Sequence, residues 1–182
     1  MNNKILKTAT GFTLLEIIIV LAIMAIAMTI AIPNVMSWLP DYRLKAAARD
    51  LYSNMQKAKS EALKRNCSVG ITFSTVTFPT QGGGYTVFLD NGAGTNAGNA
   101  VQDPGEATLL TVAMPSGCTL YEAIFFSTSG NTPRTIYNSR GFPGNKTGHA
   151  RLRNNNSVWY EMALSNSGYP KIRKSHDGTN WN

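Results

Sequence analysis

Among the residues that could do chemistry, Glu16 stands out because it is the only charged residue between Phe12 and Ile32. An ionised carboxylate in the hydrocarbon of a bilayer costs roughly 3 kcal/mol, so a glutamate there needs a physical reason. Its charge could be neutralised by a positive group, or its side chain could reach the lipid headgroups from near the helix end. The pattern therefore marks Glu16 as the first candidate functional residue.

The other polar candidates do not form a recognisable catalytic or metal site. His149 and His176 lie in polar or Gly-rich stretches without a nucleophile or base motif beside them, so we do not expect an enzyme. Asp90, Asp103 and Glu106 lack the ligand spacing of a calcium loop. A solvated loop is predicted there, with neither metal nor cofactor.

Two cysteines, Cys67 and Cys118, have no His or Cys near them at a metal-ligand spacing, so no zinc site is expected. If the globular part of the chain faces an oxidising compartment, the two could form one disulfide. Otherwise they would serve as two small buried hydrophobic residues. The sequence leaves both alternatives open.

The carboxy-terminal part combines positive charge with aromatic rings, which can hold a phosphate backbone and stack bases. The positive residues are Arg151, Arg153, Lys171, Arg173 and Lys174, interleaved with Trp159, Tyr160 and Tyr169. An ordinary basic surface would have the same composition, and a formal net charge of +7 does not indicate nucleic acid by itself. DNA binding is therefore an alternative function.

The element that positions Glu16 is an apolar run of about 21 residues, the length at which a helix crosses a bilayer. Lys4 and Lys7 precede the run, so the positive-inside rule predicts a cytoplasmic amino terminus and an exported chain after Pro33. Two alternatives are a plain single-span anchor and an ordinary signal peptide, cut after Ala25-Ile26-Ala27 to release a soluble exported protein.

The residues around Glu16 account for the carboxylate better than these alternatives do. The run Gly11-Phe12-Thr13-Leu14-Leu15-Glu16 resembles the prepilin signature of type IV pilins and type II secretion pseudopilins. The resemblance implies that a prepilin peptidase cuts after Gly11 and methylates the new amino terminus at Phe12. It also implies that Glu16 pairs with this amine between adjacent subunits. As in that family, Pro33 is expected to kink or locally melt the helix, with Pro40 as a second bend.

Beyond Pro40, apolar residues recur every three or four positions, which is typical of one helical face and predicts a helix ending near Arg65. They are Leu44, Ala47, Ala48, Leu51, Met55, Ala58 and Ala62. The opposite face is predicted to be a solvated, basic surface. A helix from Phe12 to Arg65 would be roughly 80 Å long, so its apolar half must lie in a bilayer or against copies of itself in a filament.

Short runs with strand character follow the predicted helix at residues 67–73, 85–89, 109–114, 124–126, 150–152, 158–164 and 170–173. Segments rich in Gly, Asn or Pro separate them at 81–84, 90–105 and 138–148. The predicted fold class is therefore α+β, in which the long helix packs on an antiparallel sheet.

Over nearly the whole chain, the order of these segments resembles GspH/FimT-type minor pseudopilins, and so does the run Ser139-Arg140-Gly141-Phe142-Pro143-Gly144. The resemblance implies a leader at 1–11, a transmembrane or filament-core helix at 12–33, an amphipathic helix at 34–65 and a periplasmic β domain at 66–182. It implies a structural subunit of a type IV pilus or type II secretion system, anchored in the inner membrane by one span. Its expected partners are prepilin peptidase and other pilins or pseudopilins, with DNA uptake as the alternative.

Overall fold

The computed structural model describes residues 11–92, 96–126, 130–144 and 146–181. Lys4, Lys7 and the predicted leader up to residue 10 lie outside the described residues. The chain divides into two compact units, Met1–Leu39 and Pro40–Asn182.

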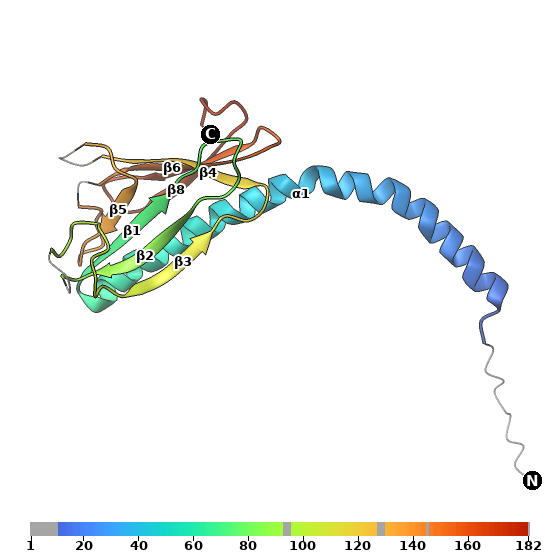
Figure 1. The fold of residues 1–182 in the computed structure, drawn as a ribbon, viewed down its shortest axis with the longest axis horizontal. Helices are drawn as coiled ribbons and strands as arrows, with labels where there is room; N and C mark the ends of the chain where they lie inside the picture. The colour runs from blue at the N-terminus through green and yellow to red at the C-terminus, as the bar shows by residue number, and fades with distance from the viewer. Residues whose placement is uncertain (1–10, 93–95, 127–129, 145, 182) are drawn as a thin grey trace, which may run out of the picture. The chain divides into compact units, whose positions relative to one another are not determined.

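A single helix, α1, runs from Leu14 to Arg65 and contributes to both units (Figure 1). The predicted end at Arg65 is confirmed. The chain stays helical at Pro33 and Pro40, so the predicted alternative of local melting is wrong. The physical reason is that each proline removes only one backbone hydrogen bond, while the residues on either side keep theirs.

In the second unit, one face of α1 is buried and forms the centre of the core. The buried residues are Leu44, Ala47, Ala48, Leu51, Met55, Ala58 and Ala62, which are the seven predicted from their spacing. Four of the seven are alanines, and small side chains let sheet residues approach the helix closely. The predicted amphipathic face is therefore confirmed.

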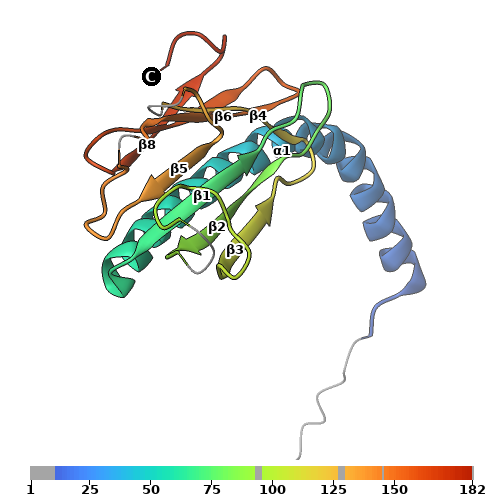
Figure 2. The same ribbon diagram turned by 60° about the vertical axis from the view of Figure 1, so that its left-hand side comes forward.

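In the described part of this unit, eight strands form two antiparallel four-stranded sheets (Figure 2). The first sheet has the order β3-β2-β1-β5, with β1 at Ser68–Ser74, β2 at Gly84–Asp90, β3 at Thr108–Ala113 and β5 at Arg134–Tyr137. The second has the order β4-β6-β7-β8, with β4 at Cys118–Phe125, β6 at Gly148–Asn154, β7 at Trp159–Leu164 and β8 at Pro170–Ser175. Alternate residues of both sheets join the buried face of α1 in one apolar core.

The α+β class and the antiparallel pairing are confirmed, and every predicted strand is present with shifted ends. The strands divide into two sheets, a division that the sequence did not specify. Strand β5 and the first six residues of β4 were not predicted. Strand β5 has only four residues, Arg134–Tyr137, and is held by its pairing with β1, which is far away in sequence.

The two cysteines are free, so the disulfide alternative is wrong. Cys67 directly follows the end of α1, whereas the buried Cys118 lies within electrostatic range of Arg43 near the other end of this helical part. Arg43 and Arg65 are separated by about 33 Å along the helix at 1.5 Å per residue. A disulfide needs Cα atoms within about 7 Å, which this separation excludes.

Candidate functional site

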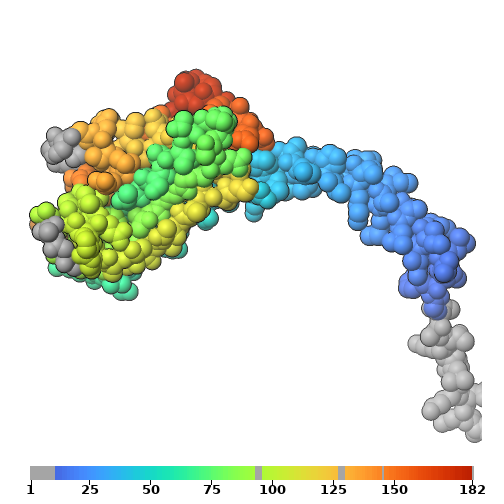
Figure 3. All heavy atoms as spheres, in the orientation of Figure 1, coloured from blue at the N-terminus to red at the C-terminus, as the bar shows by residue number. Residues whose placement is uncertain are grey.

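The amino-terminal unit presents an exposed apolar helix. Every residue from Gly11 to Trp38, which belong to the blue segment in Figure 3, is exposed. Phe12 and Leu14 leave 80% and 77% of their surface open. By length and composition this part of α1 could cross a membrane. So large an apolar surface is unstable in water, and a bilayer or other subunits must cover it.

Glu16 lies in the first turn of this helix, where Thr13 caps the start. The side-chain oxygen of Thr13 accepts a hydrogen bond from the backbone N–H of Glu16 at 3.2 Å. Thr13 and Glu16 have the Thr-x-x-Glu spacing of a capping box, a signal that the sequence already contains. A carboxylate at the positive end of a helix gains about 0.3–1 kcal/mol from the helix dipole, which offsets part of the cost of its apolar surroundings.

The Gly11–Phe12 bond precedes α1 in a segment without helical hydrogen bonds. Gly11 is exposed, and a Cβ atom added to it would meet no atom within 4 Å. Exposed, non-helical chain is the kind of substrate that peptidases cleave most readily. Just beyond it, Phe12, Glu16 and Val20 line part of a shallow recess of about 230 Å³ on the helix surface. The structure thus places the predicted processing residues beside the predicted assembly residue.

A second candidate region is the solvent-facing side of the β4-β6-β7-β8 sheet, where most of the predicted DNA-binding residues lie. Successive strand residues point to opposite faces, so Arg151 and Arg153 of β6 share this face. The strand register places Arg173 and Lys171 of β8 on it as well. Lys174 directly follows Arg173 in β8, so its side chain points to the other face of the sheet. The structure therefore brings together four of the five predicted residues.

Much of the positive charge on this face is neutralised by carboxylates. Glu161 of β7 lies between two arginines, 2.9 Å from Nε of Arg151 and 3.4 Å from Nη1 of Arg173. Nη1 of Arg151 also contacts Glu122 at 2.6 Å. Sequence reasoning missed both glutamates, because their cross-strand positions depend on the pairing of distant strands. Arg151 therefore serves first as a link between strands.

Arg153 is held by aromatic rings on the same face. Its guanidinium lies 3.6 Å from the ring centroid of Phe78 and 5.2 Å from that of Trp159. Such stacking satisfies the cation locally and keeps the side chain flat against the sheet. DNA binding by the five predicted residues stays a prediction; four of them lie on this face, and its three arginines already contact carboxylates or aromatic rings.

The acidic loop after β2 is a structural element and differs from its prediction. Asp90 and Glu106 are buried, so the expected solvated loop is wrong for both carboxylates. Asp90 accepts backbone hydrogen bonds from Gly98 and Ala100, and Glu106 accepts one from Gly92 at 3.3 Å. Burial raises the pKa of Asp90, although those backbone donors favour its charged form. These oxygens hold the loop together by binding its N–H groups.

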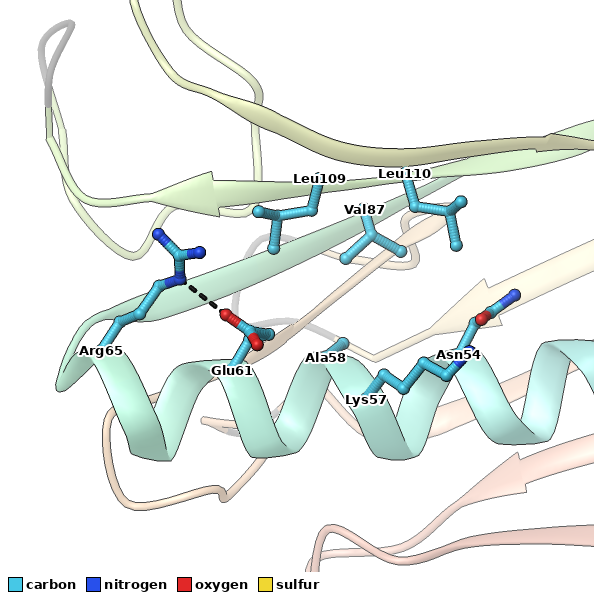
Figure 4. A pocket seen from close by; sticks show the side chains of 8 residues that line it. All are labelled: Asn54, Lys57, Ala58, Glu61, Arg65, Val87, Leu109 and Leu110. Atoms are coloured by element: carbon cyan, nitrogen blue, oxygen red, sulfur yellow. Dashed lines mark hydrogen bonds and ion pairs between the residues drawn. The ribbon is translucent and has the colours of Figure 1, made fainter.

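A groove of about 430 Å³ lies between α1 and the strands β2 and β3 (Figure 4). Its apolar lining comprises Ala58, Val87, Leu109 and Leu110, and its polar rim comprises Asn54, Lys57, Glu61 and Arg65. Glu61 and Arg65 form an ion pair of 2.6 Å at the rim. Within the described residues, no three His, Cys, Asp or Glu side chains are grouped so that they could hold a metal ion.

Comparisons with known proteins point to one family. The family model described as type II transport protein GspH matches residues 47–168, about two thirds of the chain. The model described as the prokaryotic N-terminal methylation motif matches residues 6–32, which include the processing residues and Glu16.

Two individual proteins are also similar. A pilin-like protein, PilA1 of Thermus thermophilus, is 36% identical over 100 residues, which are 54% of this chain and 56% of that protein. The chain thus matches only about half the length of this curated relative. The crystal structure of the type IV minor pilin FimU from Pseudomonas aeruginosa PAO1 matches 76% of this chain and 97% of that chain, with 16% identity and a TM-score of 0.46.

The methylation motif lies at the amino terminus, and the GspH model covers most of the globular unit after it. This is the order of segments that the sequence predicted. The chain therefore belongs to the type II transport protein GspH family of pilin-like proteins and carries a prokaryotic N-terminal methylation motif.

Proposed function

We propose that this chain is a structural minor pilin or pseudopilin, which acts by assembling into a filament through its amino-terminal helix. The observation that carries the proposal is the exposed apolar part of α1, which bears the lone carboxylate Glu16 within the methylation motif. A helix of this kind can be stored in a bilayer and later packed against other subunits, because both environments cover apolar surface. Catalysis is not part of the proposed role.

In this proposal, residues 1–11 are a leader that prepilin peptidase removes after Gly11, and Phe12 becomes the methylated amino terminus. Residues 12–33 span the inner membrane before assembly, and Pro33 marks the end of that span. Residues 34–65 form the amphipathic helix and residues 66–182 the periplasmic β domain. The amine on Phe12 and the carboxylate of Glu16 are separated by four residues, so one subunit's carboxylate can neutralise a neighbour's amine.

Intact mass and amino-terminal sequencing of the protein from membranes would test the processing step. Cells with the native prepilin peptidase should yield a chain that starts at methylated Phe12, and cells without it should yield the uncleaved chain. A start after Ala27 would instead identify an ordinary signal peptide and contradict the proposal.

Gly11→Val and Glu16→Gln separate processing from assembly. A Cβ atom at Gly11 would meet no atom within 4 Å, so loss of cleavage in Gly11→Val would reflect the peptidase site and not a folding defect. Glu16→Gln keeps the shape but removes the charge, and we expect it to be cleaved yet to enter filaments poorly. Filaments with a normal content of Glu16→Gln would show that the carboxylate has no role in assembly.

A further inference from the structure

Strand β3 lies at one edge of the β3-β2-β1-β5 sheet and pairs with β2 on one side only. The backbone N–H of Met114 donates a hydrogen bond to the carbonyl of Gly83, which shows where the two strands bond to each other. Bonded and non-bonded positions alternate along an antiparallel pair, so the N–H and C=O groups of Thr111 and Ala113 point away from β2. Within the described residues no strand pairs with this side of β3. It therefore presents backbone groups to which another strand can bond.

The other sheet edges in the described part of the chain have features that prevent such pairing. The free side of β4 is already bonded by residues 76–82, and the carbonyl of Leu120 accepts a hydrogen bond from the N–H of Val76 at 3.0 Å. Strand β5 has only four residues. The exposed residues of β8 are mostly basic, namely Lys171, Arg173 and Lys174.

Strand β3 has none of these protections. Its sequence, Thr-Leu-Leu-Thr-Val-Ala, contains neither a charge nor a proline. The irregularity in its pairing with β2 lies near Thr108, and residues 110–113 pair regularly. Native proteins avoid an open, uncharged strand edge of this kind unless a partner covers it. The edge of β3 is therefore a candidate interaction surface.

The groove between α1 and the strands β2 and β3 lies beside this edge and can receive side chains of an added strand. Figure 4 shows Val87, Leu109 and Leu110 pointing from the strands toward α1. Successive residues of a strand point to opposite faces, so alternate side chains of a strand next to β3 would lie over the groove. Apolar side chains there would cover Leu109 and Leu110, which are only partly buried.

The charges beside the groove are mixed in sign. Two acids and three cations lie along this side of α1, and Glu61 is paired with Arg65 at 2.6 Å. These charged residues are Asp50, Lys57, Glu61, Lys64 and Arg65. Their charges nearly cancel, so they do not favour a strongly charged partner. An uncharged strand would complement the uncharged edge, because no unpaired charge would then be taken out of water.

We propose that β3 binds an extended, uncharged segment of a different protein, which adds an antiparallel strand to the sheet and places alternate apolar side chains over the groove. Strand addition of this kind obtains affinity from main-chain hydrogen bonds and specificity from the pockets for alternate side chains. The interaction goes beyond the proposed function, because it uses a sheet edge of the globular unit and not the amino-terminal helix.

A second copy of this chain does not fit the edge in the same way. Strand β3 runs alongside the second half of α1 in both views (Figures 1 and 2). An antiparallel pair of two β3 strands would therefore point the two α1 helices in opposite directions, and one membrane could not hold both amino-terminal segments. This exclusion rests on the proposed function, in which the amino-terminal segment is anchored in a membrane.

A peptide of alternating Thr and Val, labelled with a fluorophore, tests the proposal on the full chain in neutral detergent micelles. In an antiparallel strand, the residues that bond to Thr111 and Ala113 share their exposed face, and the residues between them face the groove. The peptide should bind with Val over the groove and with the Thr N–H groups donating to β3. Methylating the Thr nitrogens should abolish binding, whereas methylating the Val nitrogens should leave it within about twofold. Equal effects of the two methylations, or a larger effect at Val, would overturn the proposal.

Amide exchange followed by NMR in the same samples locates the binding. The N–H groups of Thr111 and Ala113 should exchange fast in the free chain and slow down when the peptide binds, while those of Leu110 and Val112 are protected throughout by β2. Peptide binding without slower exchange at Thr111 and Ala113 would place the peptide elsewhere and contradict strand addition.

Thr111→Pro removes one outward N–H, and proline is tolerated on an edge strand where its nitrogen faces solvent. It should weaken peptide binding by about fivefold or more, and Ala113→Pro should act in the same way. The matched control Thr111→Val keeps the N–H and loses only the hydroxyl contact with Thr86, so binding should stay within about twofold. Protected Leu110 and Val112 amides show that a proline variant keeps its pairing with β2. Equal binding by Thr111→Pro and Thr111→Val would refute the proposal.

Oxidative cross-linking in native membranes tests for a second copy at the edge. Cys67→Ser removes the half-exposed thiol, and Thr111→Cys places a reporter on β3. Homodimers linked through Thr111→Cys would overturn the assignment of the edge to a different protein. Cleavage after Gly11 is measured in the same samples and should be normal in Thr111→Pro, so failure of the proposed function is seen separately from failure of strand addition.

Discussion

Two buried tyrosines should respond in opposite ways to the same substitution. Tyr137 of β5 is fully buried, and within the described residues its hydroxyl has no hydrogen-bond partner. Tyr85 of β2 is 3% exposed, but its hydroxyl accepts a hydrogen bond from Nδ2 of Asn54 at 2.7 Å. Burial accordingly raises the pKa of Tyr137 above that of an ordinary tyrosine. Comparing the two tyrosines therefore separates the effect of a buried hydroxyl without a hydrogen bond from that of a buried hydroxyl with one.

We expect Tyr137→Phe to stabilise the globular unit and Tyr85→Phe to destabilise it. An unsatisfied buried hydroxyl costs about 1–3 kcal/mol, and removing it recovers part of that cost. Loss of the Tyr85 hydrogen bond should cost about 0.5–1.5 kcal/mol, because the half-buried Asn54 amide can then turn to water. The two variants should thus differ by about 2 kcal/mol, or roughly 7 °C in midpoint temperature for a unit of this size.

Thermal and denaturant unfolding of the full chain in detergent, followed by tryptophan fluorescence, would measure the difference. Trp159 and Trp181 both lie in the globular unit and report on its packing. Equal destabilisation by Tyr137→Phe and Tyr85→Phe would refute the reasoning, because it would mean that the Tyr137 hydroxyl also makes a stabilising hydrogen bond.

A thiol, a carboxylate and a glycine of the globular unit give three further predictions. Burial raises the pKa of the Cys118 thiol to about 11, so a thiol reagent at pH 8 should modify only Cys67 in the native chain. After unfolding without reductant the reagent should modify both thiols, because both cysteines are free. Only one reactive thiol per unfolded chain would contradict the free cysteines of this structure. Backbone N–H groups of Asn180 and Thr179 hold the pKa of Asp177 below its usual range. Its contribution to the order of the terminal loop is therefore fully present above the ordinary aspartate pKa and is lost as the pH falls from there through the lowered pKa. Fluorescence of Trp181 against pH should show this transition in the native chain and lose it in Asp177→Ala. A Cβ atom in Gly148→Ala would overlap the carbonyl oxygen of Ile124, so β4 and β6 must separate and we expect a loss of at least about 2 kcal/mol, measured by denaturant unfolding; unchanged stability would contradict the β4–β6 register.

The carboxylates show most clearly where reading the sequence failed. Asp90 and Glu161 look alike in the sequence, as single acids near Gly-rich or basic stretches. In the structure, Asp90 accepts hydrogen bonds from the backbone N–H groups of Gly98 and Ala100 in the following loop. Glu161 bridges Arg151 and Arg173 on the two neighbouring strands. Such partners come from loop closure and strand register, which no local pattern specifies.

Local spacing determined the parts of this protein that depend on neighbours in the sequence. The three-and-four pattern predicted all seven buried residues of α1, and the apolar run predicted a segment of membrane-spanning length, because helix periodicity and a membrane's thickness act on the chain over short distances. The processing and assembly roles of Gly11, Phe12 and Glu16 were predicted from their resemblance to the prepilin signature. Only the tertiary structure decided that the strands form two sheets, that the cysteines are free and that Arg151 of β6 is already paired with Glu161. Each of these depends on which distant segments meet, and many pairings have the same local pattern, so the packing of the whole core selects among them.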